Sequence, residues 1–200
     1  MSPRTREQNE QIREERRNQV LRAAVTLFAR DGFDSVSTAS IAKAAGVSHG
    51  TVFFYYKTKE ELYRAAVLEP LGPTHGLVKA LLTGPESPLG RIESLARLTL
   101  SSYAKEEAYL TLVHQAMRLK DRFKSLHDEL VAFSEANKAL LADVIAEGQE
   151  SGEFLSGDPA RMATLFFAFL NGCGMMHPAE AGDRIWDDAV PIALRLILRP

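Results

Sequence analysis

The segment GVSHGTVFFYYKTKEEL, residues 46–62, decides the fold, because it can be read either as a β-strand or as part of a helical motif. Propensity alone favours a strand over residues 51–56, where β-branched and aromatic side chains follow one another. The flanking residues favour a helix, since Ser48 is a typical N-cap and Thr58 with Glu61 forms a T-x-x-E capping box. A strand between two helix starts has no partner nearby, so we predict a helix that begins after Ser48.

The upstream segment SVSTASIAKAAGVS, residues 35–48, completes a helix-turn-helix pattern. Ser37 can cap a first helix with Ile41 on its buried face, and Gly46 then breaks that helix at a tight turn. The second helix of such a motif can enter the major groove of DNA, where aromatic rings contact thymine methyl groups.

The aromatic residues of the second helix divide into two sets. Val52, Tyr55 and Tyr56 recur at helical spacing and are predicted to face the core. Phe53 and Phe54 are predicted to turn outward, on the same side as three small or polar residues, His49, Gly50 and Thr51. Large exposed rings need a binding partner, although either ring could instead pack against a neighbouring helix.

Composition narrows the class of protein. The chain has 200 residues, 46% of them hydrophobic, and a single cysteine, Cys173, which excludes an internal disulfide and a zinc site built on paired cysteines. We therefore expect no metal, no cofactor and a reducing, cytoplasmic location. The charged N-terminus predicts no signal peptide, and the longest apolar run, near residues 165–170, is too short to span a bilayer.

Charge is distributed unevenly along the chain. Residues 1–64 contain 11 Lys and Arg against 8 Asp and Glu, a net charge of +3, whereas the remainder contains 13 against 18, a net charge of −5. A basic N-terminal part indicates a polyanionic partner. Residues 1–17 carry five arginines among glutamates and glutamines with almost nothing to bury, so we predict a mobile basic arm that runs into the first helix.

The rest of the chain reads as helical almost throughout, which predicts an all-α fold. A first helix runs from Val20 to a glycine stop at Asp31-Gly32, and the proline after Ser87 and after Asp158 indicates an N-cap followed by the first helical position. The later helices are predicted over residues 88–105, 107–121, 125–151, 158–176 and 183–198.

The segment TASIAKAAGVSHGTVFFYYKTKEELYRAAV, residues 38–67, preceded by AAVTLFARDGFDSVS, resembles the DNA-binding region of the TetR family of bacterial transcriptional regulators. The resemblance covers about residues 17–66. It implies a dimeric, all-helical repressor whose N-terminal domain binds a palindrome in double-stranded DNA and whose C-terminal domain senses a small molecule. The expected domains are the basic arm 1–17, a helix-turn-helix domain 18–66, and a ligand-binding and dimerisation domain 67–200.

Carried over by position, the resemblance implies phosphate contacts from Thr51, Tyr55 and Lys59, and base contacts from His49, Phe53 and Phe54. His49 stands where the family often has lysine or arginine, and a histidine binds phosphate less strongly at neutral pH. Phe53 replaces a frequent tyrosine, which favours apolar contacts to bases. The predicted DNA-binding residues are Ser37, Lys43, Ser48, His49, Gly50, Thr51, Phe53, Phe54, Tyr55 and Lys59.

The predicted effector site rests on polar and pliable side chains within apolar helices. Asn137 interrupts an apolar stripe of the helix at 125–151, where its amide must either bond a neighbouring helix or orient a ligand. Methionine and phenylalanine suit a small hydrophobic effector, although they would also build a plain core. The predicted ligand-binding residues are Thr99, Tyr103, His114, Met117, Phe133, Asn137, Phe166 and Phe169.

The last two predicted helices, ATLFFAFLNGCGMM and IWDDAVPIALRLIL, are apolar nearly all round and need a partner on every face. We predict a homodimer through these helices, which would place two recognition helices about 34 Å apart on a palindrome. The chain has no P-loop, no paired C-x-x-C and no E-x-x-H, which argues against an enzyme. A helical interaction or membrane-surface protein, with the arginine arm on anionic lipid, remains the alternative.

Overall fold

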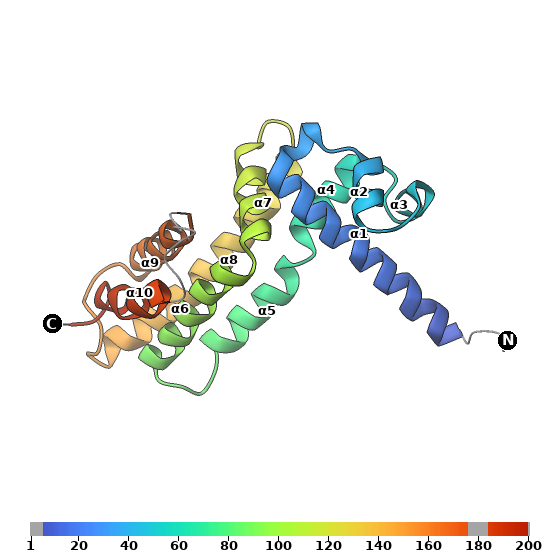
Figure 1. The fold of residues 1–200 in the computed structure, drawn as a ribbon. Coiled ribbons are helices and arrows are strands. Elements are labelled where there is room, and N and C mark those ends of the chain that lie inside the picture. The colour runs from blue at the N-terminus through green and yellow to red at the C-terminus, as the bar shows by residue number, and fades with distance from the viewer. Residues whose placement is uncertain (1–5, 176–183, 200) are drawn as a thin grey trace. The chain divides into compact units, whose positions relative to one another are not determined.

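The computed structural model describes residues 6–175 and 184–199. Its regular structure is helical, which confirms the predicted all-α fold; within the described residues one isolated antiparallel bridge joins Phe154 to Leu198. The helices, drawn in Figure 1, are α1 Arg6–Ser35, α2 Thr38–Ala44, α3 His49–Tyr55, α4 Lys59–Leu68, α5 Leu71–Leu82, α6 Pro88–Lys105, α7 Glu107–Arg118, α8 Lys124–Glu150, α9 Pro159–Met175 and α10 Arg184–Arg195.

Side-chain caps start several of these helices, as predicted. The Ser87 hydroxyl accepts the N–H of Gly90 at 3.2 Å, with Pro88 in the first position of α6. The Asp158 carboxylate accepts the N–H of Ala160 at 2.9 Å at the start of α9. These caps satisfy backbone donors that have no partner inside the helix. The starts of helices with such capping residues therefore agree with the sequence-based prediction to within a few residues.

Helix α5 was not predicted, because Pro70, Gly72 and Pro73 read as breakers. In the structure Pro73 is the third residue of α5, where a backbone N–H would have no intrahelical acceptor, so a proline costs little. Val78 and Leu82, four residues apart, are the buried positions of the helix. Burial of that face outweighs the low propensity of the first turn.

The mobile arm predicted over residues 1–17 is wrong for its described part, because α1 already begins at Arg6. Residues 1–5 lie outside the described residues. Ion pairs support the helix on its exposed surface, with Arg6 bonded to Glu10 at 3.1 Å and Arg17 close to Glu14 at 3.7 Å. Glutamine, glutamate and arginine all have good helix propensity, so the segment can be helical although it lacks the apolar face by which a helix is recognised in a sequence.

The chain forms two compact units. The head unit comprises Met1–Pro70 with Ala108–His127, and the body unit comprises Leu71–Glu107 with Asp128–Pro200. Most of α7 and the start of α8 therefore group with the helix-turn-helix segment. The functional domain boundary after residue 66 stays a prediction.

The core of the head unit is a cluster of aromatic rings. The Tyr63 ring lies 5.1 Å from Phe28 and 5.0 Å from Phe33, both edge-on, and 5.1 Å from Phe123 in a stacked arrangement. Phe28 and Tyr63 are completely buried. Such pairs contribute about 0.5–1.5 kcal/mol each beyond the burial of their area. The cluster fixes α1 and α4, and with them the turn that carries α3.

In the body unit α6 packs against α5, α9 and α10. The buried Arg91 of α6 donates to the carbonyl oxygen of Leu82 at 3.0 Å and forms an ion pair with Glu147 of α8. Gly148 allows the ring of Phe154 to lie directly against α8, where a Cβ would overlap it. Close packing around α6 thus orders this unit.

None of the described helices is long and apolar enough to cross a membrane. Nor do three or more histidine, cysteine, aspartate or glutamate side chains gather anywhere in residues 6–175 and 184–199 in a way that could hold a metal ion.

Candidate nucleic-acid interface

A tight turn at Gly46 joins α2 to α3. Gly46 has a φ of 67°, a left-handed conformation that suits glycine, and the N–H of Val47 beyond it donates to the Ala42 carbonyl at 3.0 Å. On the far side, the Ser48 hydroxyl accepts the N–H of Thr51 at 3.1 Å and caps α3. The helix predicted over the aromatic stretch is thus present, and the strand is not.

One face of α3 is buried and the other is exposed. Val52 and Tyr56 lie in the core, whereas the Phe53 side chain is 39% exposed and that of Phe54 is 59% exposed. Burying a phenylalanine is worth about 1.5–3 kcal/mol, and these two forgo much of that gain. Their exposure favours a surface that binds something outside the head unit.

His49 is held beside Phe53 at the start of this exposed face. Its ring lies edge-on to the Phe53 ring at 4.8 Å, and its Nε2 atom is 2.9 Å from the Thr38 hydroxyl at the start of α2. The two helices of the motif therefore position the histidine together. Ser37, Lys43, Ser48 and Gly50 are likewise exposed, and Thr51 is half-buried.

Tyr55 and Phe54 both contact the N-terminal half of α1. The Tyr55 hydroxyl donates to the carbonyl oxygen of Arg13 at 2.9 Å, and the Arg13 guanidinium lies over the Phe54 ring at 5.7 Å. A phosphate can only accept a hydrogen bond, so a phosphate contact from Tyr55, as the resemblance implies, would require its hydroxyl to turn away from Arg13. Its role stays a prediction.

The Lys59 side chain has a different position from the expected phosphate clamp. Its ammonium group donates to the carbonyl oxygens of Phe33 at 2.8 Å, in the last turn of α1, and of Val36 at 3.0 Å, just after α1 ends. A cation there satisfies carbonyls that have no helical partner. As placed, Lys59 therefore supports the fold, and its backbone N–H at the start of α4 is the part of the residue that suits a phosphate.

Residues 46–50, GVSHG, also match the G-x-S-x-G pattern of nucleophilic serines. In that chemistry the serine sits on a sharp turn between a strand and a helix, with a base beside it. Ser48 follows α2 instead, and its hydroxyl accepts the Thr51 N–H and lies 2.8 Å from the Thr51 hydroxyl. Its surroundings are those of a helix cap.

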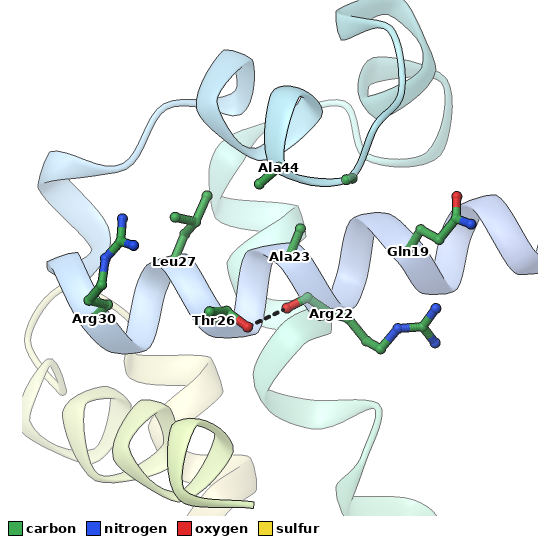
Figure 2. Close-up of a pocket in the computed structure, with 8 residues that line it drawn as sticks. Gln19, Arg22, Ala23, Thr26, Leu27, Arg30 and Ala44 are labelled. Atoms are coloured by element: carbon green, nitrogen blue, oxygen red, sulfur yellow. Dashed lines mark hydrogen bonds between the residues drawn. The ribbon is translucent and has the colours of Figure 1, made fainter.

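The head unit also contains two grooves. Figure 2 shows the first, of about 460 Å³, between α1 and the end of α2; it is lined by Gln19, Arg22, Ala23, Thr26, Leu27, Arg30, Ala44 and Ala45. The second, of about 380 Å³, is lined by Asp31, Gly32, Phe33, Asp34, Ser35, Gln115, Arg118 and Leu119. Both carry charged walls and contain none of the predicted ligand-binding residues.

Six predicted ligand-binding residues lie in the body unit. Asn137 of α8 accepts a hydrogen bond from Nδ1 of His75 at 2.5 Å, and the His75 ring lies edge-on to Phe133 at 5.9 Å. His75, on the α5 helix that the sequence did not indicate, was missed as a partner. The bond satisfies the amide oxygen of the half-buried Asn137, and the role of Asn137 toward a ligand stays a prediction.

Tyr103 of α6 is buried, and its hydroxyl donates to Oδ1 of Asn171 in α9 at 2.5 Å. Burial raises the pKa of Tyr103 to about 12, so the hydroxyl remains a donor at neutral pH. A Cβ at Gly174 would overlap the Tyr103 ring, so this glycine allows close approach of α9 within the chain. Phe166 is buried, and Thr99 and Phe169 are half-buried.

The other two predicted ligand-binding residues, His114 and Met117, lie on α7 in the head unit. His114 is half-buried, and desolvation lowers its pKa below the usual value. Met117 is exposed. A pattern of helical spacing could not distinguish α7 from the helices of the body unit, because that distinction depends on tertiary packing.

Comparisons with known proteins agree with this geometry. Residues 20–66 match the family described as "Bacterial regulatory proteins, tetR family". The transcriptional repressor KstR2 of Mycolicibacterium smegmatis is 24% identical over 140 residues, which cover 70% of this chain and 67% of that protein. The transcriptional regulator UidR of Escherichia coli is 23% identical over 182 residues, 91% of this chain and 90% of its own length.

Among solved structures, the ketosteroid transcriptional regulator KstR2 of Mycobacterium tuberculosis has a TM-score of 0.79 at 18% identity. The match covers 92% of this chain and 96% of that one. At such identity the likeness concerns the fold, which extends from the helix-turn-helix motif through the helices that follow it.

Proposed function

Because this chain belongs to the TetR family of bacterial transcriptional regulators, a DNA-binding and not an enzymatic family, we propose that it represses transcription from a palindromic operator as a homodimer and is released by a small hydrophobic effector. The observation that carries the DNA-binding part is the exposed face of α3. His49, Phe53 and Phe54 protrude from a helix whose opposite side is anchored in the core. A face of this kind suits major-groove contacts.

The operator contacts would combine two kinds of group. Phe53 and Phe54 offer apolar edges to thymine methyl groups, and Thr51 and Lys43 offer polar or charged groups to phosphates. With both rings in the groove, sequence preference would come mainly from apolar contacts. The half-sites should therefore contain thymine at the positions that the rings reach.

Exposed apolar side chains on α9 and α10 support the proposed dimer. Leu165 of α9 is 67% exposed, Ile192 of α10 is 49% exposed, and Leu196, the residue after α10, is 45% exposed. Covering such side chains from both helices with the same surface of a second copy would form a four-helix interface with two-fold symmetry. Two-fold symmetry in the protein matches a palindrome in the DNA.

The effector is proposed to bind in the body unit, where Thr99, Tyr103, Phe133, Asn137, Phe166 and Phe169 supply apolar surface and a few polar groups. Two relatives support a hydrophobic compound, since one is described as a ketosteroid transcriptional regulator and another as a fatty acid metabolism regulator. An acyl or polycyclic molecule is the class of effector that such side chains would accept.

Release from DNA would follow from linkage between the two ligands. Along the chain, α4, which is capped by Thr58, connects the recognition helix to α5, the first helix of the body unit. A body conformation preferred by the effector would hold the two recognition helices at the wrong spacing. Operator DNA must then weaken effector binding by the same factor, typically equivalent to about 1–3 kcal/mol.

Selection of bound duplexes from a random pool at physiological salt tests the proposal directly. We expect a palindrome with half-site centres about 34 Å apart, the separation of successive major grooves. A pool that returns no preferred sequence would contradict the function, and binding to anionic vesicles without preference among duplexes would favour the membrane-surface alternative. Effector affinity measured with and without operator tests the linkage, and identical values would end that part of the proposal.

A further inference from the structure

The N-terminal half of α1 covers no core. Val20 is the first buried residue of the helix, and the described side chains before it are exposed or half-buried. Figure 1 shows this half extending beyond α2, α3 and α4 of the head unit. A helix segment that buries so little is marginal by itself in water. Its side chains are therefore available for contacts outside the fold.

The charges of this segment are separated between two faces. At about 100° per residue, the four arginines fall within an arc of about 100° that continues the face of Val20 and Ala24. The glutamates occupy the neighbouring and opposite directions. The arginines are Arg6, Arg13, Arg16 and Arg17, and the glutamates are Glu7, Glu10, Glu14 and Glu15.

Two of these arginines have no ion-pair partner among residues 6–175 and 184–199. Arg17 is paired with Glu69 and Glu14, and Arg6 with Glu10. Arg13 and Arg16 are exposed, and no carboxylate of the described residues lies within ion-pair distance of either. The arginine face thus keeps a net positive charge close to α3.

The arginine face is attached to the recognition helix. The Arg13 guanidinium lies over the Phe54 ring, and the Arg13 carbonyl accepts the hydroxyl of Tyr55. When α3 lies against a duplex, Arg13 is therefore close to the duplex, because it contacts Phe54 and Tyr55 of α3. The helix axis then carries Arg6, about 10 Å farther along α1, away from the groove that α3 enters.

We propose that the N-terminal half of α1 is a second DNA-contacting element, in which Arg6, Arg13 and Arg16 bind backbone phosphates beside the groove that α3 enters. The proposal rests on the DNA-binding function proposed above. Guanidinium groups match phosphate with two parallel hydrogen bonds and hold their charge at any physiological pH. A lipid surface fits poorly, because Ile12 is the only large apolar residue between Arg6 and Gln19 and a membrane helix needs an apolar face.

The test is the salt dependence of DNA affinity in the full-length protein with Arg6, Arg13 and Arg16 replaced by glutamine, whose helix propensity is similar. Each phosphate that the variant no longer neutralises lowers the slope of log affinity against log salt by about 0.9. We expect a smaller slope and at least tenfold weaker binding at about 0.15 M salt. Operator and unrelated duplexes should be affected alike, because phosphates carry no sequence information.

The matched control replaces Glu7 and Glu15, which lie away from the arginine arc, by glutamine. This variant should keep the wild-type slope and bind no more weakly, and circular dichroism should show equal helicity in all three proteins. Trimming the base pairs that flank the selected site should weaken the wild type but leave the triple arginine variant unchanged.

The outcomes separate the two proposals. If the wild type selects no duplex, the DNA-binding function itself fails. If the wild type selects a palindrome and the triple arginine variant binds it with unchanged affinity and slope, only the second contacting element is wrong. Loss of binding to anionic vesicles with unchanged DNA binding would also overturn it, in favour of lipid.

Discussion

The ammonium nitrogen of Lys59 lies 2.8 Å from the carbonyl oxygen of Phe33 and 4.3 Å from the centre of the Phe33 ring. One lysine thus bonds the backbone at the end of α1 and packs on the aromatic cluster that supports the recognition helix. Lys59 was expected to hold phosphate, so its contribution to stability and its contribution to DNA binding need to be measured separately.

Replacing Lys59 by methionine keeps the apolar stem and removes the hydrogen bonds to Phe33 and Val36. Hydrogen bonds from a charged donor contribute about 1.5–3 kcal/mol, so we expect the free energy of unfolding in urea to fall by about 2 kcal/mol. The matched control is Lys43→Met, an exposed lysine of α2, which should weaken DNA binding and leave stability within about 0.5 kcal/mol. Unchanged stability of Lys59→Met with weaker DNA binding would restore the phosphate role.

Replacing Phe54 by alanine should change which duplexes are selected. Because the ring is largely exposed, the melting temperature should stay within a few degrees of the wild type. Loss of an apolar contact to a thymine methyl should relax preference at one position of each half-site, by at most the cost of one mismatched base pair, which is about 1–3 kcal/mol. An unchanged preference, measured by selection from a random pool, would mean that Phe54 only supports Arg13.

Replacing Leu165 by glutamate should break the proposed dimer. A carboxylate on each copy would be buried without a partner at the α9 surface, so sedimentation should give a monomer, and operator affinity should fall by at least tenfold because avidity is removed. Leu77→Glu on α5, where the wild-type leucine is 48% exposed, is the control and should remain a dimer. A dimeric, helical Leu165→Glu protein would place the interface elsewhere.

Gly148→Ala tests the packing of the body unit. The added methyl would overlap the buried ring of Phe154, and overpacking of this kind costs about 1–3 kcal/mol. Gly76→Ala in α5 has open space around the new methyl and should stabilise the protein by about 0.5–1 kcal/mol. Denaturant unfolding of both variants measures the difference, and equal stabilities would show that Phe154 moves aside freely.

His114 predicts a pH dependence of stability. Desolvation lowers the pKa of His114 in the folded protein, so the unfolded state binds the proton more readily. Above the unfolded pKa of about 6.5 the ring is neutral in both states and does not change the free energy of unfolding. As the pH falls below about 6.5 toward the lower pKa of the folded state, only the unfolded state gains the proton, so the free energy of unfolding decreases. The urea midpoint should therefore fall less between pH 7 and pH 5 in His114→Gln than in the wild type. Parallel curves would remove His114 as a cause.

Local signals in the sequence predicted much of the fold. Gly46 and the cap residues Ser37, Ser48 and Ser87 act within a few residues along the chain, so their effect could be read from spacing alone. The exposure of Phe53 and Phe54 followed from the same helical period once α3 was placed.

Contacts distant in sequence could not be predicted. Lys59 reaches carbonyls 23 and 26 residues earlier, and His75 meets Asn137 across 62 residues. The helical N-terminal half of α1 was also missed because it has no apolar face, and α5 was missed because Pro70, Gly72 and Pro73 read as breakers. Side-chain contacts of this kind depend on tertiary packing and could not be read from spacing along the chain.

The head unit is assembled from two separated stretches of chain, and Gln115 of α7 donates to the Ala29 carbonyl of α1 at 2.9 Å while Phe123 stacks on Tyr63. A hybrid regulator made by joining residues 1–70 to a foreign sensor would lack both contacts. A fusion that aims to change the DNA sequence recognised should instead exchange the exposed residues of α2 and α3 alone, and keep α1, α4 and α7 from one protein.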